Sequence, residues 1–401
     1  WNDFDTILQQ KNKKKKQSRE RTMELINYIV PFVINYIIPF VILLTIVVFI
    51  HEYGHYYFAK KYGVGVTDFS ICFGREIFGW NDKSGTRWKI GWLPLGGYVK
   101  FFGDRNVFSQ SEQQDIIKRY NEEDQKKLFI LKPLYQRSII VVAGPLANFV
   151  LAILIFTMIN MFVGKDMTPA VIDEVQKDSP AFVAGMKKND KIISIDNKKV
   201  ESILEVSTFI NTSTSETIEF VLLRNDQEIS LLVKPNLVDS KDSLGNSVKK
   251  RMIGIKFSPL NNEFQKQPLG PSKAIYYSIK EVWFYSIASL KYLGKKVIGE
   301  GDFSQLGGPI KIAQITGQIA KYGIIPFFTI MAYISISLGL INLFPIPMLD
   351  GGHLMFYLIE KILGRPLSQK TQEGFFRIGI FLLFSLMFFV TFNDLKDLGL
   401  F

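Results

Sequence analysis

Four long apolar runs constrain this chain more than any other feature of its sequence. They cover residues 25–50, 139–163, 324–349 and 374–392. A helix of about 20 apolar residues spans the hydrocarbon core of a bilayer. Lipid tolerates only helices and closed barrels, because every backbone group must be hydrogen-bonded internally. The sequence therefore predicts a polytopic α-helical membrane protein with four transmembrane helices.

The end of the first run carries the sequence HEYGH, in which His51, Glu52 and His55 fit the pattern H-E-x-x-H. Positions i and i+4 of a helix share one face, so the two histidines can bind one metal ion together. Glu52 lies between them and can take a proton from a water activated by the metal. The pattern is short, but ionisable side chains inside a span are costly and indicate function. The chain has 3 histidines, and two of them are here.

A third metal ligand is needed, because catalytic zinc usually takes three protein ligands. Asp350 follows the proline-broken segment FPIPML at the end of the third run, where irregular backbone is tolerated if it lines a cavity. From the residues alone, Asp350 is either this ligand or an interfacial helix cap. His353 is a further candidate.

The first soluble segment, residues 63–137, begins with strand-like sequences. Residues 64–74 and 86–104 predict strands, with a turn at Pro94 and Gly96–Gly97. A charged helix is expected over about residues 110–132. Basic residues outnumber acidic ones in this segment, which fits the cytoplasmic side of a membrane.

The second soluble segment lies between the second and third runs. Residues 167–258 alternate strand-like runs with two helical stretches, and they predict a compact α+β domain. Residues 272–299 predict an amphipathic helix on the membrane surface.

The net charge of +11 does not require a nucleic-acid partner. Seven Lys and Arg residues lie within residues 11–21 alone, and no aromatic-basic recognition module accompanies them. Basic residues flanking membrane spans explain the charge, so the lipid bilayer is an expected partner and nucleic acid is not. Cys72 is the single cysteine, which excludes an internal disulfide.

The expected segments, in chain order, are a basic polar tail (1–22), a first span with the HExxH motif (23–62), a cytoplasmic β-element with a charged helix (63–137), a second span (138–164), the α+β domain (167–258), a linker with the amphipathic helix (259–323), a third span (324–350), a loop (351–373), a fourth span (374–393) and a C-terminal tail (394–401). The tail 1–22 precedes Met23 and is either native or added upstream of the native start.

Three motifs together resemble those of a known family. HEYGH, PLGGYVKFFG and NLFPIPMLDGGH are similar to the motifs of the site-2 protease family of intramembrane zinc metalloproteases. The resemblance runs from about Met23 to Leu395 and is closest to the bacterial regulator-of-sigma-E protease branch. LGGPIKIA, at residues 306–313, also resembles this branch.

The resemblance implies a role for each motif residue. His51, His55 and Asp350 would bind one Zn²⁺ per chain, with Glu52 as general base, so it favours ligation by Asp350 over capping. His353 is not a ligand in the family and is expected either to support a ligand or to be structural. The residues implied to contact substrate are Asn342, Pro345, Gly96, Gly97 and Tyr98, the last three in a membrane-associated β-element.

Residues 171–200 resemble a bacterial PDZ domain of circularly permuted type, so the α+β domain is expected to be one PDZ-like domain. By analogy, Ile253, Gly254 and Ile255 would supply its carboxylate-binding loop. Two interpretations stay open: the groove binds peptide C termini, or the domain acts only as a steric filter.

The function implied by the resemblance is zinc-dependent hydrolysis of peptide bonds within or near the membrane spans of single-pass proteins. The substrates it implies are proteins already cleaved once, such as anti-sigma factors, or signal-peptide remnants. The expected location is the bacterial inner membrane, with the PDZ-like domain periplasmic and the active site near the cytoplasmic face. The same topology places both termini outside the cytoplasm, whereas the lysine run before Met23 predicts a cytoplasmic N terminus.

Two other functions remain as alternatives from the sequence. One is a catalytically inactive PDZ scaffold in the membrane. The other is a cation transporter, which the near absence of charge in the second and fourth runs disfavours.

Overall fold

A computed structural model describes residue 27 and residues 30–103, 120–213, 215–241, 247–257, 266–297 and 307–397. The basic tail 1–22 and residues 110–119 of the charged helix expected over 110–132 lie outside these ranges. Within the described part of 110–132 there are two short elements, helix α4 (Glu122–Gln125) and the 3-10 turn η2 (Phe129–Leu131).

Within the described ranges, four helices are long and apolar enough to cross a membrane: Val30–Lys61, Leu134–Phe162, Ile324–Asn342 and Lys370–Asp397. The first contains a π-helical turn, η1 (Val33–Ile37), that continues into α2 (Ile38–Lys61). The others are α5 (Leu134–Phe162), α10 (Ile324–Asn342) and α12 (Gln369–Asp397). On α12, Phe381, Phe384 and Phe388 are each at least 70% exposed. A surface of this kind is stable in lipid and not in water, so the chain is a membrane protein.

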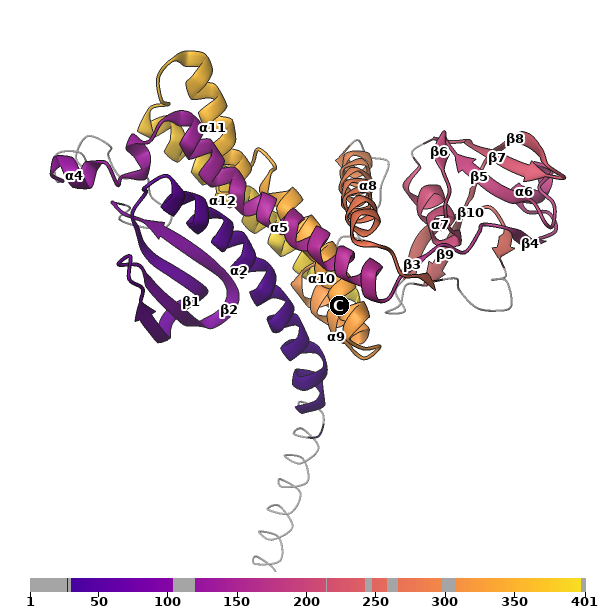
Figure 1. Cartoon of the computed structure of the whole chain (residues 1–401), viewed down its shortest axis with the longest axis horizontal. Helices are drawn as coiled ribbons and strands as arrows, with labels where there is room; N and C mark the ends of the chain where they lie inside the picture. Colours follow the sequence, from indigo (N-terminus) through magenta and orange to yellow (C-terminus); the bar gives the residue numbers. More distant parts are fainter. Residues whose placement is uncertain are drawn as a thin grey trace, which may run out of the picture.

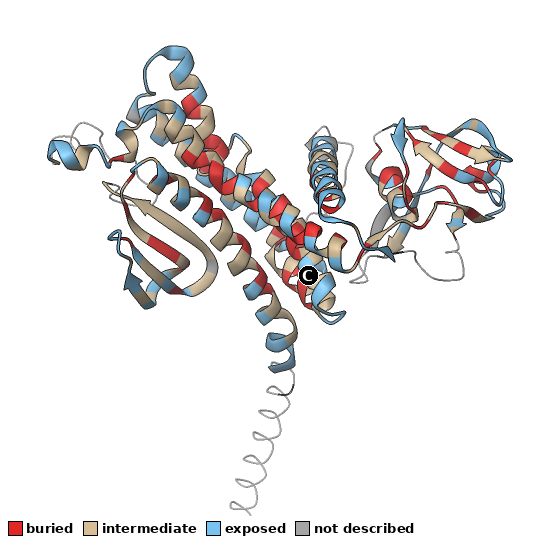
Figure 2. Ribbon diagram, viewed as in Figure 1, coloured by how far each residue is buried: buried red, intermediate tan, exposed pale blue. Residues whose placement is uncertain are grey.

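Helix α5 is the central element of the helical part of the molecule. It contacts α2, α10, α8 and α11, and buried positions follow its length in Figure 2. Small residues let the backbones approach: a Cβ on Gly54 of α2 would meet the Ala143 carbonyl at 2.4 Å. A Cβ on Gly339 of α10 would lie 3.0 Å from the Pro145 carbonyl oxygen of α5. Packing through small residues is the usual way for helices to associate in a bilayer.

Strands β1 (Val66–Asn81) and β2 (Arg87–Phe101) form a curved sheet beside α2 (Figure 1). Both strands bend midway, so that Phe69 lies opposite Val99 on one side and Trp88 on the other. The turn predicted at Pro94 and Gly96–Gly97 corresponds to the bend of β2. Strand β1 is longer than the predicted strand 64–74, whereas β2 lies within the predicted range 86–104, and the pairing shifts register at the bends.

Residues 165–257 form a separate α+β unit at the C-terminal end of α5 (Figure 1). Its hydrophobic core includes Ile172, Ile195, Phe220 and Leu222. A four-stranded sheet has the order β6-β5-β7-β8, and two further pairs are β11-β4 and β10-β9. The elements of this unit are β3 (Lys165–Asp166), β4 (Ile172–Val175), α6 (Pro180–Val183), β5 (Lys191–Ile195), β6 (Lys198–Lys199), α7 (Ile203–Thr212), β7 (Ile218–Arg224), β8 (Gln227–Val233), β9 (Asn236–Lys241), β10 (Ser247–Met252) and β11 (Ile255–Phe257).

The segment expected as a linker holds more structure than predicted. It begins with β12 (Lys266–Gln267), which pairs with β3. Helix α8 (Pro271–Val297) matches the predicted amphipathic helix and packs against α5 and α10. Helix α9 (Pro309–Ala320) was not predicted. It packs against η1 and α12, and these tertiary contacts stabilise it.

Three expected boundaries near the C terminus are wrong. Helix α10 ends at Asn342 instead of continuing to 350, because Pro345 and Pro347 remove backbone donors. The expected loop 351–373 begins as helix α11 (Asp350–Leu363), which buries Phe356 and ends at Gly364, whose φ is +68°. Helix α12 continues to Asp397, into the expected tail, because Asp394 binds the start of α9.

Candidate active site

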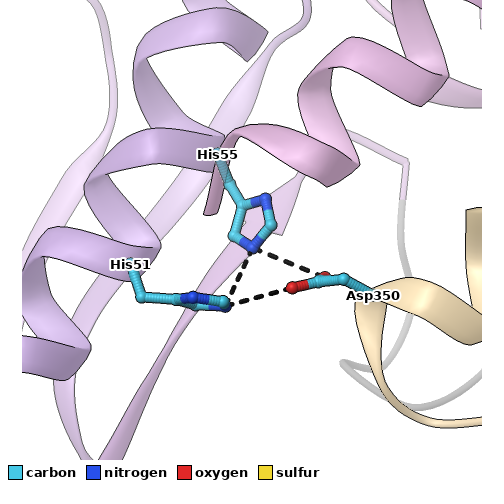
Figure 3. A group of neighbouring side chains, drawn as sticks. All are labelled: His51, His55 and Asp350. Carbon is cyan, nitrogen blue, oxygen red and sulfur yellow. Dashed lines mark hydrogen bonds and ion pairs between the residues drawn. The ribbon is translucent and has the colours of Figure 1, made fainter. Parts of the chain in front are cut away.

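Helix α2 presents both histidines of the HEYGH motif toward α5 and α11. Figure 3 shows the His51 and His55 rings converging with the Asp350 carboxylate, the first residue of α11. The Nε2 atoms of His51 and His55 are 3.2 Å apart. His51 Nε2 lies 3.2 Å from Asp350 Oδ2, and His55 Nε2 lies 3.5 Å from Asp350 Oδ1. The structure thus brings together three side chains from positions 51, 55 and 350.

The donor set fits a zinc ion. Zinc takes imidazole nitrogen and carboxylate oxygen at about 2.0–2.2 Å, and ligands at that distance in a tetrahedron are about 3.4 Å apart. The observed separations are close to this value. In addition, Asp350 Oδ2 is buried and accepts no hydrogen bond within the described part of the chain, although His51 Nε2 is near it. A buried carboxylate oxygen without a donor is costly, and a cation would satisfy it.

The His55 ring is fixed by α5. Its Nδ1 lies 2.9 Å from the Ile140 carbonyl oxygen. A carbonyl only accepts hydrogen bonds, so Nδ1 carries the proton and Nε2 keeps its lone pair for a metal. The ring also lies directly against Gly144, where a Cβ would be 2.2 Å from Nε2. Glycine at this position is therefore a condition for the site.

An irregular loop and a partly buried ion pair position the carboxylate of Asp350. Met348 adopts a φ of +85°, a strained value for a bulky residue that is frequent at functional sites. The Arg137 guanidinium of α5 donates to both carboxylate oxygens of Glu360 on α11, at 2.5 and 3.2 Å. This bidentate pair ties α11 to α5 and so holds Asp350 opposite the histidines.

Glu52 lies between the histidines and the curved sheet. A Cβ on Gly97 of β2 would be 3.2 Å from the Glu52 Cγ and 2.8 Å from the Ser70 carbonyl oxygen. The bend of β2 therefore packs directly on the candidate general base. Tyr98, on the same strand, stacks on Phe73.

The other predicted residues lie farther from this group. Asn342 is the last residue of α10, and Pro345 is exposed in the loop before Asp350. Ile253, Gly254 and Ile255 belong to the 165–257 unit at the other end of α5, where Gly254 has a φ of +78°. His353 packs on the rings of Phe356 and Phe376, outside the metal-ligand group.

Two site residues were not predicted, and both are on α5. One is Gly144, since a small residue in a span usually indicates helix packing. The other is Asn148, whose amide lies 3.2 Å from His51 Nδ1. A buried amide within an apolar span was the available signal, but its partner could not be read without the packing of α2 on α5.

The fold and the site together define a membrane-bound zinc metalloprotease. The chain belongs to peptidase family M50, which it matches over residues 39–386. It is 39% identical over 374 residues to a protein of Agrobacterium fabrum that is named as a zinc metalloprotease, with 93% of this chain and 97% of that protein covered. It is 34% identical over 380 residues to metalloprotease MmpA of Caulobacter vibrioides, with 90% and 95% covered.

One solved structure shows a local similarity. The PDZ domain of an SdrC-like protein from Listeria monocytogenes is 21% identical and covers 22% of this chain and 85% of that domain, with a TM-score of 0.18. At this TM-score the similarity supports no conclusion about the fold of residues 165–257.

Proposed function

We propose that this protein is an intramembrane endopeptidase that cleaves single-pass membrane proteins within or near their spans. The observation that carries the proposal is the position of the three converging ligands. They lie inside a bundle of candidate membrane spans, beside an acidic side chain. Gly144 is five residues beyond Ile139, where the apolar run of α5 begins, which places the ligands about 8 Å along the helix from that end, within the hydrocarbon core of about 30 Å.

The residues of the site have different roles in hydrolysis, metal binding and proton transfer. His51, His55 and Asp350 would hold the metal, and bound zinc supplies Lewis acidity, which lowers the pKa of a water and polarises the scissile carbonyl. Glu52 takes a proton from the attacking water as the C–O bond forms. It then gives that proton to the amide nitrogen as the C–N bond breaks, so that an amine leaves.

The curved sheet is the element best placed to orient substrate. A helical substrate hides its carbonyls in internal hydrogen bonds, so it must unwind before cleavage. An extended segment could pair with the sheet by β-augmentation, which would satisfy the freed backbone groups. The contact of Gly97 with Glu52 places β2 next to the reacting groups. Asn342, at the end of α10, and Pro345, in the loop that presents Asp350, are proposed to line the same path.

The substitution Glu52→Gln tests the catalytic assignment. It removes the proton acceptor and keeps the size of the side chain. We expect zinc content to stay at one per chain and cleavage of a transmembrane reporter to fall at least 100-fold, as is typical for loss of a general base. A variant that still cleaves at the original rate would exclude the proposed role of Glu52.

We further propose that the active site lies toward the cytoplasm and the 165–257 unit outside it. The end of the bundle near α11 and the start of α5 carries Lys60, Lys61, Lys127, Lys132 and Arg137, as the positive-inside rule expects of the cytoplasmic end. The 165–257 unit lies at the other end of α5 (Figure 1). Tags at both ends of the chain should be accessible from outside the cell membrane alone. Cytoplasmic accessibility of either tag would contradict this topology.

For the 165–257 unit we propose a steric filter rather than a peptide-binding module. The Arg251 guanidinium, beside the candidate carboxylate loop, already donates to the carbonyl oxygens of Ser213 and Ser215, at 2.6 and 2.5 Å. Donors on both terminal nitrogens of this guanidinium are therefore already engaged within the unit. Spectra of the protein should be unchanged by C-terminal peptides, whereas cleavage should depend on the size of the substrate's outer domain. Saturable shifts with such peptides would favour binding instead.

A further inference from the structure

The His51 ring has a second nitrogen whose partner decides whether the first can bind a metal. Its Nδ1 lies 3.2 Å from Nδ2 of Asn148 on α5. The Asn148 side chain is fully buried. Among the described residues, its Oδ1 has no hydrogen-bond partner. An amide with one end bonded and the other orphaned, in a buried site, needs a physical explanation.

The hydrogen bonds around the two rings form one consistent chain. Asn148 Nδ2–H donates to His51 Nδ1, so neutral His51 carries its proton on Nε2. The Nε2–H of His51 then faces His55 Nε2 and Asp350 Oδ2, each 3.2 Å away. His55 in turn donates from Nδ1 to the Ile140 carbonyl. In this arrangement His55 is ready to bind a metal and His51 is not, because its Nε2 is protonated.

Zinc ligation requires the opposite tautomer of His51. Nε2 must be free, so the proton must be on Nδ1, and Nδ1–H needs an acceptor. The Asn148 amide can supply one, because turning it by about 180° exchanges its nitrogen and oxygen. After this turn Oδ1, which has no partner among the described residues, can accept a hydrogen bond from the Nδ1–H of His51.

We infer that Asn148 is a positioning residue whose amide turns with metal binding, so that Oδ1 accepts the Nδ1–H of His51 and leaves Nε2 free for zinc. The inference rests on the ligand set proposed above. The backbone around Asn148 is well fixed for this purpose. Its carbonyl oxygen accepts a hydrogen bond from Ser335 Oγ of α10 at 2.9 Å, and Gly339 packs against its Cβ.

Two substitutions of Asn148 test the inference by zinc affinity, measured with competing chelators on the full-length protein in detergent. Asn148→Leu removes the acceptor, and we expect zinc affinity to fall about 10- to 100-fold. Asn148→Asp keeps the shape and can only accept, so we expect an affinity near that of the unsubstituted protein. If Asn148→Asp loses zinc and Asn148→Leu keeps it, the inference is wrong.

Asn160 provides a matched control on the same helix. It is also buried, and its Nδ2 donates to Ser278 Oγ of α8 at 3.2 Å. Asn160→Leu should lower the thermal stability of the chelator-treated protein but leave zinc affinity unchanged. Equal losses of zinc affinity in Asn160→Leu and Asn148→Leu would show that Asn148 is only a structural contact between helices.

A double substitution separates the inference from the ligand set. In the His51→Ala background, Asn148→Leu should cause no further loss of zinc affinity, because the ring that it orients is gone. An undiminished further loss would overturn the inference. If the unsubstituted protein itself binds no zinc, the ligand set fails first. If it binds zinc and Asn148→Leu binds as tightly, only the role of Asn148 fails.

Discussion

At the residue scale, the site requires a position without a side chain, Gly144, as well as its three ligands. Gly144 leaves room for the His55 ring, since a Cβ there would lie 2.2 Å from the ligand nitrogen. Two features of α5, a missing side chain at 144 and a buried amide at 148, therefore shape a site whose ligands come from other elements.

The substitution Gly144→Ala should displace His55 and lower zinc affinity at least tenfold. Alanine favours a helix over glycine by about 1 kcal/mol, so a loss of zinc could not be attributed to a weaker helix. Zinc content after dialysis is the measurement. Gly374→Ala on α12 is the control, because nothing lies within 4 Å of its Cβ position. Normal zinc content in Gly144→Ala would show that the His55 ring can bind zinc from another position.

At the element scale, the 165–257 unit is held together by a buried ion pair. Arg224 donates to both carboxylate oxygens of Asp190, at 2.7 and 2.6 Å, and Asp190 is 1% exposed. Burial opposes ionisation, but the bonds from Arg224 and from the Lys187 backbone N–H outweigh it and hold the pKa of Asp190 below its ordinary value. A carboxylate with a lowered folded-state pKa stabilises the fold above its unfolded pKa, about 4.

We expect Asp190→Asn to lower the free energy of unfolding of this unit by about 3 kcal/mol at pH 7. The difference from the unsubstituted protein should shrink below about pH 4, as Asp190 itself becomes protonated. Hydrogen exchange of β5 and β7, corrected for the intrinsic pH dependence, measures it. Asp173→Asn is the control: its pair with Lys188 is exposed, so the change should be below about 1 kcal/mol. A difference that is constant with pH would rule out this origin.

Elements also show where sequence reasoning succeeds and fails. The spans were predictable because apolar length alone decides them, and HEYGH was predictable because its geometry is local to one helix. The convergence of Asp350 followed from the family resemblance, not from spacing. Helix α9 and the roles of Gly144 and Asn148 were not predictable, because each depends on which helix faces which.

At the scale of the whole molecule, the last helix is tied to the first. The Asp394 carboxylate of α12 accepts the backbone N–H groups of Gly308, Ile310 and Lys311 at the start of α9. Helix α9 in turn packs on η1, where a Cβ on Gly317 would meet the Asn35 carbonyl at 2.4 Å. The C-terminal span therefore stabilises the entry of the first span through α9.

Asp394→Ala should lower the stability of the protein by about 1–2 kcal/mol, the usual cost of losing an N-terminal helix cap. Thermal unfolding in detergent measures the effect. Asp394→Asn keeps an acceptor oxygen and should recover most of the loss. If both variants unfold at the same temperature as the unsubstituted protein, α9 is held by its other contacts.

The distance in sequence between the ligands has a consequence for the timing of synthesis. His55 and Asp350 come from opposite halves of the chain, and at 5–20 residues per second the ribosome needs about 15–60 s to pass from one to the other. During that interval the nascent protein would carry two of its three ligands and its general base, but no complete zinc site. The protease would thus enter the bilayer before it can cleave other membrane proteins. Its zinc site would be completed only when the segment that carries Asp350 has been inserted.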